Sequence, residues 1–193
     1  MARVTYLTEK AAEGDAKRAL ASDLGGMNVF RVLAHASTSI VPMMRLGRAI
    51  LSKQRLSHRL RELLILLAMR LEDGKYEWAQ HIEIALGVGI TQTEIDAVHD
   101  LRLDDATFSV AERAWLAFGR QVVEQVRVDQ STFDAVRAQA SEAEIVEAII
   151  AMSFYMTLAR ITEALEVDND PVQGMKVLAF ASRPAVAKGA TDS

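Results

Sequence analysis

The stretch from Leu63 to Met69 reads Leu-Leu-Ile-Leu-Leu-Ala-Met and is apolar at every position. Ser57 precedes it as a helix N-cap, and Asp73-Gly74 follows it as a helix end. A helix that is apolar on all sides has to be buried on all sides. In a chain of 193 residues, such burial indicates either the central helix of one domain or a helix at a subunit interface. On this ground we expect a homo-oligomer.

Signals for helix starts recur along the chain. Three Ser or Thr residues are each followed three positions later by Glu, which is the capping-box pattern. These pairs are Thr91 with Glu94, Ser109 with Glu112 and Ser141 with Glu144. The last box opens the longest apolar segment, which we expect to run to about Leu165. No segment alternates convincingly with the period of two that marks strands, so the sequence predicts an all-α fold.

The helical segments fall into two halves, at residues 28–100 and 109–167, joined by the polar stretch 102–107. We expect one helical domain over residues 28–170. An N-terminal extension (residues 1–27, partly helical) precedes it, and a C-terminal segment and tail (residues 171–193) follow it. Pro184–Ser193 is typical of a frayed tail.

The composition excludes several classes of function. The chain has no cysteine, which excludes disulfides, thiolate nucleophiles, cysteine-ligated zinc and iron–sulfur clusters. A net charge of −4 gives no reason to expect nucleic acid as a partner. No apolar run approaches the roughly 20 residues that span a bilayer, and no signal-peptide pattern is present. We therefore expect a cytoplasmic protein with no membrane partner. The four histidines are not at zinc-ligand spacing, so no metal or cofactor is expected.

Three titratable residues are candidates to carry chemistry: Glu62, Glu77 and His81. Glu77 and His81 are four residues apart on one predicted helix and face the same way. Glu62 lies near the start of the preceding helix, about 17 Å from the turn at Asp73-Gly74. A straight hairpin does not bring Glu62 to His81, so a crossing angle or a neighbouring subunit has to do so. A carboxylate beside an imidazole fixes the tautomer of the ring and suits it to proton transfer near neutral pH.

The same three residues also have a purely structural interpretation. In that interpretation Glu77 and His81 are an exposed i,i+4 pair, and Glu62 is a first-turn acid favoured by the helix dipole. A metal site formed by the three side chains is a further, weaker alternative. Spacing alone leaves these alternatives open.

The segment Tyr76–Thr91 reads Y-E-W-A-Q-H-I-E-I-A-L-G-V-G-I-T and is preceded by E-L-L at Glu62–Leu64. This pattern resembles the carboxymuconolactone decarboxylase family, whose fold is shared with alkylhydroperoxidase D. Weaker similarity extends through Asn28–Arg31, Ser109–Ala114 and Phe154–Leu165. The resemblance implies an alkylhydroperoxidase D-like helical bundle that assembles as a dimer, trimer or hexamer.

The resemblance also implies what happened at the site. The peroxidase branch of the family has a Glu, a Cys-x-x-Cys pair and a His four residues after the second Cys. By resemblance, these positions are Glu62, Gly74, Glu77 and His81, so the spacing is kept while both sulfurs are gone. Disulfide-relay peroxidase activity should therefore be absent. The decarboxylase branch is similar in lacking the cysteine pair and in its Glu-x-x-x-His. Met156 stands where relatives commonly have Asn, which leaves the family's lactone substrate open.

Proton transfer at carbon is the chemistry that this set of residues implies. Loss of carbon dioxide from a lactone acid leaves negative charge that conjugates into a carbonyl. Cationic His81, held by Glu77 or Glu62, is the candidate to protonate the carbon. Arg61 or Arg160 could pair with a substrate carboxylate, because a guanidinium matches its two oxygens. A surface salt bridge or a helix end is the alternative use of either arginine.

Three further residues are candidates to contact a substrate. Tyr76 and Trp78 flank the motif and could line a pocket, although core or interface packing is an alternative use of both. His35, within Leu-Ala-His-Ala, is a candidate near that pocket, and its alternative is a hydrogen-bonded core histidine.

The sequence thus predicts a cofactor-independent lyase-type enzyme for a small organic acid or lactone, as in aromatic-compound catabolism. The reaction is a decarboxylation or a related isomerisation or hydration. The alternative is a non-enzymatic oligomeric protein that kept the fold after losing the redox cysteine pair. An enzyme needs a water-accessible cavity at Glu62, Glu77 and His81, whereas a structural descendant buries or pairs all three without one.

Overall fold

The computed structural model describes residues 2–182, and this part of the chain contains helices and no strand, as the sequence predicts. Its helices, in chain order, are α1 (Gly14–Leu20), α2 (Asn28–Leu33), α3 (Ile40–Lys53), α4 (His58–Leu71), α5 (Lys75–Gly87), α6 (Gln92–His99), α7 (Val110–Gln125), α8 (Gln130–Arg137), α9 (Glu142–Ala164) and α10 (Gly174–Ser182).

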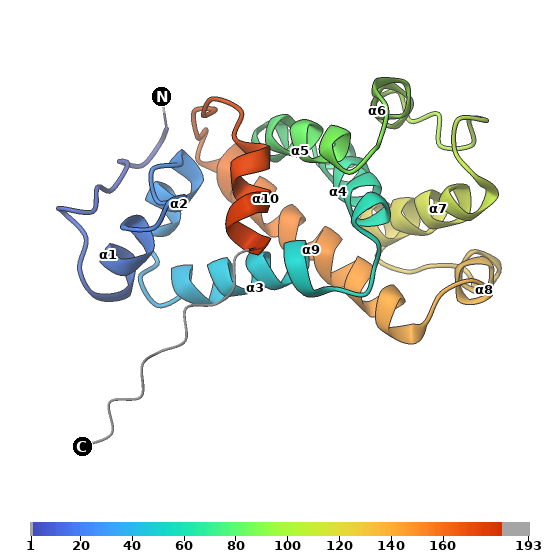
Figure 1. The fold of residues 1–193 in the computed structure, drawn as a ribbon, viewed down its shortest axis with the longest axis horizontal. Coiled ribbons are helices and arrows are strands. Elements are labelled where there is room, and N and C mark those ends of the chain that lie inside the picture. The colour runs from blue at the N-terminus through green and yellow to red at the C-terminus, as the bar shows by residue number, and fades with distance from the viewer. Residues whose placement is uncertain (1, 183–193) are drawn as a thin grey trace, which may run out of the picture.

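Helix α4 runs through the middle of the bundle (Figure 1). It packs against α5, α6, α7 and α9. Every side chain from Arg61 to Met69 is at most 1% exposed. The expectation that this apolar helix is buried on all sides is confirmed. The burial is achieved within one chain, so it is the central-helix interpretation that holds for α4.

The predicted helix starts are also confirmed. The Ser57 side chain accepts a hydrogen bond from the backbone N–H of Leu60 at the start of α4. All three capping boxes are formed, at the first turns of α6, α7 and α9. The last box opens the longest helix in the described part of the chain, with 23 residues.

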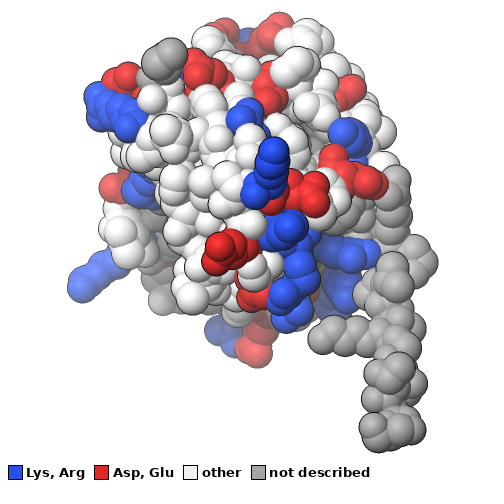
Figure 2. Space-filling model, turned by 90° about the vertical axis from the view of Figure 1, so that its left-hand side faces the viewer, with Lys and Arg blue, Asp and Glu red and all other residues white. Residues whose placement is uncertain are grey.

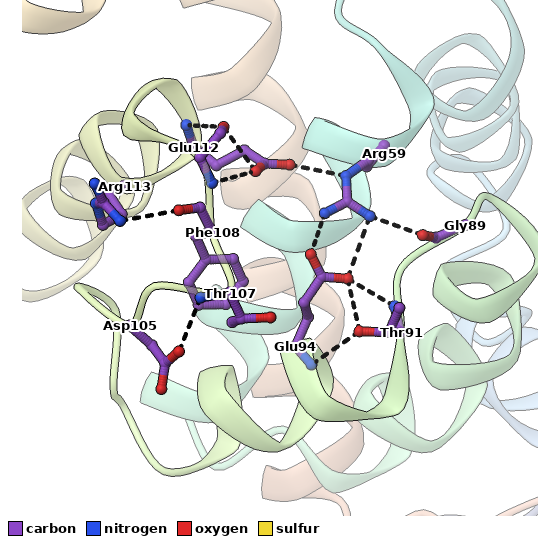
Figure 3. Close-up of polar contacts among 10 residues, drawn as sticks. Arg59, Gly89, Thr91, Glu94, Asp105, Thr107, Phe108, Glu112 and Arg113 are labelled. Atoms are coloured by element: carbon purple, nitrogen blue, oxygen red, sulfur yellow. Dashed lines mark hydrogen bonds and ion pairs between the residues drawn. The ribbon is translucent and has the colours of Figure 1, made fainter.

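Arg59 ties two of these caps together (Figure 3). Its Nε donates to Glu112 at 2.8 Å, and its Nη1 donates to the carbonyl of Gly89 at 2.8 Å. Its Nη2 donates to Glu94. Glu94 and Glu112 are the third-position residues of the boxes of α6 and α7. One arginine of α4 therefore fixes the N-termini of two other helices.

Helix α9 corrects one expectation. By length and composition it could cross a membrane, since its most apolar window has a mean hydropathy of 1.5. This was not evident from the sequence, because polar residues interrupt each apolar run of the helix. In the structure 44% of that window is buried inside the protein, where α9 packs against α4 and α5. Core helices of globular domains pass the same test of length and composition, so one such helix is weak evidence for a membrane span.

Both segments flanking the expected domain pack onto it. At the N-terminal end, α1 contacts α2 and α3, and its Ala16, Ala19 and Leu20 are buried. At the C-terminal end, α10 lies across α3 and α5 (Figure 1). A Cβ at Gly174 would lie 2.2 Å from the backbone oxygen of Gln80, so α10 begins in direct contact with α5. The tail predicted at Pro184–Ser193 lies outside the described residues.

Charges of both signs are mixed on the face of the molecule that carries α1 and α2 (Figure 2). Lys and Arg side chains stand beside Asp and Glu side chains, and a broad part of this face is uncharged. This mixture is in keeping with the net charge of −4.

Candidate functional site

An apolar cavity of about 90 Å³ lies between α2, α3, α5, α9 and α10. Its walls are mainly aliphatic, aromatic and methionine side chains, among them Met27, Phe30, Met43, Met44, Phe154 and Leu158. The polar side chains that line it are few, and they include both Glu77 and His81. A mostly apolar cavity with a few converging polar groups is the usual form of a small-molecule site.

Glu62 and His81 meet at the back of this cavity. Nδ1 of His81 lies 2.6 Å from Oε2 of Glu62, and both residues are buried. The sequence left open whether a second subunit is needed for this contact, and the structure shows it within one chain. An ionised carboxylate only accepts hydrogen bonds, so Nδ1 carries a proton and Nε2 is the working nitrogen of the neutral ring.

Arg61 holds Glu62 from the other side. Its Nε donates to Oε1 of Glu62 at 2.8 Å, and its Nη1 donates to the backbone oxygen of Leu51 at 3.0 Å. Burial raises the pKa of Glu62, but the charges of His81 and Arg61 and their hydrogen bonds outweigh it, so the pKa is lowered overall. Glu62 is therefore a carboxylate. Arg61 is fully buried behind it and does not line the cavity.

The second ring nitrogen of His81 faces the cavity. No residue among 2–182 forms a hydrogen bond with Nε2. Two unpaired polar atoms in this part of the chain are fully enclosed by protein, and Nε2 is not one of them. Those enclosed atoms are Oε1 of Gln54 and Nη2 of Arg61. Because His81 lines the cavity, Nε2 opens into it. The ring of Tyr155 packs edge-on against the imidazole, with 4.3 Å between centroids.

Glu77 reaches the same cavity but bonds a different partner. It accepts hydrogen bonds from the hydroxyl of Thr162 at 3.0 and 3.3 Å. Burial raises the pKa of Glu77 to about 7, even though the bond from Thr162 lowers it. The interpretation of Glu77 and His81 as an exposed surface pair is wrong, because each is only 3% exposed. Of the two carboxylates, Glu62 orients His81.

Tyr76 also lines the cavity, as predicted. Its hydroxyl donates to the carboxylate of Asp170 and accepts from the backbone N–H of Val29 at 3.4 Å. Burial is the main cause that raises its pKa. The Tyr76 hydroxyl is therefore occupied, and the ring serves as cavity wall.

Three other candidates do not reach the cavity. Trp78 follows Glu77 directly, so it points to another side of α5, and its ring packs on His99 at 5.7 Å. The side chain of Arg160 is 58% exposed and pairs with Glu72 at 2.8 Å. His35 lines a separate, open groove, and its Nε2 lies 2.7 Å from the backbone oxygen of Thr5.

Four polar residues at the site were not predicted from the sequence. Arg48, Gln80 and Tyr155 line the cavity, and Thr162 holds Glu77. Gln80 lies within the recognised motif, and its Oε1 accepts from the backbone N–H of Gln173 at 2.8 Å. The signal that could have found Tyr155 and Thr162 is their helical spacing from the buried residues Met152 and Ala159, which places both hydroxyls on the buried face of α9.

The position of the first cysteine in the thiol branch is closed in this chain. A Cβ at Gly74 would lie 2.8 Å from Cβ of Ala159 and 3.1 Å from Sδ of Met69. The turn that ends α4 takes its positive φ at Asp73 (+53°), and not at the glycine. Gly74 is therefore required by close packing against α9, and a cysteine there would not fit without a shift of that helix.

The three candidate catalytic residues do not form a metal site. Arg61 and His81 bond the oxygens of Glu62, and Thr162 bonds Glu77. Across residues 2–182 there is no group of three or more His, Asp or Glu side chains placed to hold a metal ion.

Comparison with known proteins links this geometry to a family. Residues 42–119 match the model of the Carboxymuconolactone decarboxylase family. This range extends from α3 to α7 and contains Glu62, Glu77 and His81. Comparison with functionally curated proteins found no match.

Several solved structures share the fold. An alkylhydroperoxidase AhpD core protein from Ralstonia eutropha JMP134, described as peroxidase-related, is 17% identical with a TM-score of 0.76, over 95% of this chain and 98% of that chain. A protein of unknown function from Agrobacterium tumefaciens is 22% identical with a TM-score of 0.66, over 73% and 96%. The debrominase Bmp8, solved as a variant with 2,3,4-tribromopyrrole, is 16% identical with a TM-score of 0.65, over 80% and 81%.

At these identities the solved structures establish the fold, and the family match covers α4 and α5, the helices that carry Glu62, Glu77 and His81. This chain therefore has an alkylhydroperoxidase D-like fold, and its residues 42–119 are similar to the Carboxymuconolactone decarboxylase family.

Proposed function

We propose that the protein is a cofactor-independent, lyase-type enzyme that transfers a proton at carbon in a small organic acid or lactone. One observation carries this proposal. Nε2 of His81 opens into an apolar cavity while Nδ1 is bonded to the buried Glu62 at 2.6 Å. An imidazole oriented by a buried carboxylate and aimed into an apolar cavity is suited to general acid–base catalysis.

A decarboxylation at this site needs one proton donor, because the carbon that loses carbon dioxide gains a hydrogen. The bond between the reacting carbon and the carboxylate breaks, carbon dioxide leaves, and the electron pair moves into a conjugated carbonyl. Protonated His81 then gives the proton on Nε2 to that carbon, and the electron pair returns to form the new C–H bond. The neutral ring regains a proton from water. Glu62 keeps its charge throughout and stabilises the imidazolium.

Glu77 supplies a second group that can hold a proton near neutral pH, because burial raises its pKa to about 7. When ionised, it accepts from the hydroxyl of Thr162. When protonated, it can donate to that hydroxyl, which then donates to the backbone oxygen of Leu158 at 3.1 Å. Thr162 thus pairs with both forms. Neutral Glu77 also avoids repulsion with an anionic substrate in the same cavity.

The non-enzymatic alternative has less support. A structural descendant should bury or pair all three residues without a cavity, whereas Glu77 and His81 both line one. The debrominase relative was solved with a small substituted ring, which supports a compact ring as the ligand of this cavity. A thiol-dependent reaction is not open to this chain, because it has no cysteine.

We also propose that the protein is a homo-oligomer. Helices α3 and α9 leave large apolar side chains exposed on the single chain, namely Leu46, Val146, Ile149 and Ile150. Analytical ultracentrifugation tests this proposal, with a monomer at all concentrations as the contradicting result.

A panel of lactone acids and unsaturated keto acids, followed by proton NMR in heavy water, tests the lyase proposal. We expect release of carbon dioxide and one deuterium at the carbon that lost it. The variant His81→Asn should lower kcat by about 10²–10⁴-fold. The matched control His99→Asn changes an exposed histidine of α6 and should turn over as the wild type does. Full activity of His81→Asn with its fold intact contradicts the proposal.

A further inference from the structure

Tyr155 is placed at the site but is not used by the reaction described above. It lies in the middle of α9 and is 5% exposed. Its ring packs edge-on against His81, with 4.3 Å between ring centroids and 79° between ring planes. It also lines the cavity. The packing fixes the ring, and therefore fixes where its hydroxyl is held.

The hydroxyl of Tyr155 differs from those of the other two tyrosines. Tyr6 bonds Asp168 at 2.8 Å, and Tyr76 bonds Asp170. The Tyr155 hydroxyl has no hydrogen-bond partner in the described part of the chain, and it is not one of the fully enclosed unpaired atoms. Buried tyrosine hydroxyls usually have a partner. This one therefore opens into the cavity with its donor unused, and His81, whose Nε2 is also unpaired, lines the same cavity.

The surroundings keep this phenol protonated. Burial, together with the negative charges of Glu62 and Glu77, raises the pKa of Tyr155, and the opposing charge of Arg61 does not cancel that rise. Tyr155 thus presents an O–H group to the cavity, not a phenolate. An O–H in an apolar cavity is a strong donor to an oxygen that gains negative charge.

We propose that the Tyr155 hydroxyl, in the same cavity as His81, is the oxyanion-binding group for a compact ring ligand whose oxygen is conjugated to the reacting carbon. In the decarboxylation proposed above, on which this catalytic role rests, the electron pair released with carbon dioxide moves onto that oxygen. Tyr155 donates a hydrogen bond to the oxygen and keeps its proton, while His81 delivers a proton to the carbon. The apolar walls hold the ring itself. The ligand class is therefore an enolate or phenolate.

Binding of 4-nitrophenolate tests this oxyanion-binding role of Tyr155 without a known substrate, because the absorbance of the ligand reports its ionisation. Nitrobenzene serves as the ring without the oxygen. At a pH at which free 4-nitrophenol is partly ionised, the wild type should bind the phenolate more tightly than nitrobenzene and should increase the ionised fraction of the bound ligand. Tyr155→Phe should weaken phenolate binding by about tenfold to a hundredfold and leave nitrobenzene binding unchanged. Tyr6→Phe, which removes a tyrosine hydroxyl outside the cavity, should bind both ligands as the wild type does.

Two results overturn the proposal. One is a wild type that fails to bind 4-nitrophenolate in preference to nitrobenzene, a measurement that needs no variant to fold. The other is a folded Tyr155→Phe that binds the phenolate as tightly as the wild type. Loss of phenolate binding in Tyr155→Phe with no turnover of any lactone acid would refute the lyase function and leave the oxyanion site standing. If lactone acids are turned over but Tyr155→Phe binds the phenolate as the wild type does, the lyase function stands and the oxyanion site is refuted.

Discussion

Nδ1 of His81 lies 2.6 Å from Oε2 of Glu62, a residue nineteen positions earlier in the chain and on a different helix. The other oxygen of Glu62 accepts from Nε of Arg61 at 2.8 Å. One buried carboxylate is thus shared between a permanent cation and the imidazole that faces the cavity. This arrangement fixes the ring from behind and leaves its front for a ligand.

Glu62→Gln should destabilise the protein by about 3 kcal/mol or more, because it leaves the buried Arg61 without its counter-charge. Glu72→Gln is the matched control, since it removes the carboxylate that pairs with the exposed Arg160. That change should lower the free energy of unfolding by less than about 1 kcal/mol. Urea denaturation measures both, and equally small losses would show that the buried pair does not hold the site.

Glu77 should make stability depend on pH. Its pKa rises from an ordinary value of 4.5 to about 7 on folding, so between these values the folded state binds more protons than the unfolded state. The stabilisation from its protonated form is complete below about pH 4.5 and is lost as the pH rises through about 7. The variant Glu77→Gln does not titrate at this position, because an amide does not ionise. Its free energy of unfolding relative to wild type should therefore rise by about 3 kcal/mol between about pH 4.5 and about pH 8. Urea denaturation across this range would disprove the assignment if the difference stayed constant.

Gly74→Ala should destabilise the protein by about 1–3 kcal/mol, because the added Cβ would lie 2.8 Å from Cβ of Ala159. Gly26→Ala is the control, since a Cβ there meets nothing within 4 Å. Adding Ala159→Gly to Gly74→Ala should recover part of the loss. Thermal and urea unfolding of the single and double variants measure the coupling between the two substitutions. If their effects on the free energy of unfolding simply add, the two residues do not constrain each other.

Gln80→Leu should loosen the C-terminal segment that covers the cavity. Oε1 of Gln80 accepts from the backbone N–H of Gln173 at 2.8 Å, just before α10. Loss of a hydrogen bond of this kind should speed amide exchange in α10 by about fivefold. Hydrogen–deuterium exchange read by mass spectrometry checks this, with peptides from α7 as the internal reference. Unchanged exchange in α10 would show that Gln80 does not hold it.

Features encoded locally were predicted well. The capping boxes at Thr91, Ser109 and Ser141 and the full burial of Leu63–Met69 depend on residues a few positions apart, so the sequence pattern is sufficient to identify them. The same holds for the family pattern at Tyr76–Thr91.

Features that depend on how helices cross were not predictable. Glu62 and His81 lie at different distances from the turn between α4 and α5, so residue spacing alone does not show that they meet. The choice of Thr162 as the partner of Glu77 and the unpaired hydroxyl of Tyr155 depend on where α9 lies against α5. Arg160 was predicted from its chemistry, because a guanidinium can pair with a substrate carboxylate. Its position on α9 places the side chain at the surface instead.

The long-range proton–nitrogen NMR spectrum of the His81 ring shows which ring nitrogen carries the proton and which one faces a ligand. Its signals are identified by their loss in His81→Asn. When the ring is neutral, the proton should lie on Nδ1, the atom bonded to Glu62. Nε2 should carry no proton and should shift when 4-nitrophenolate fills the cavity. A neutral ring protonated on Nε2, or an Nε2 signal that ignores the bound ligand, would contradict the account.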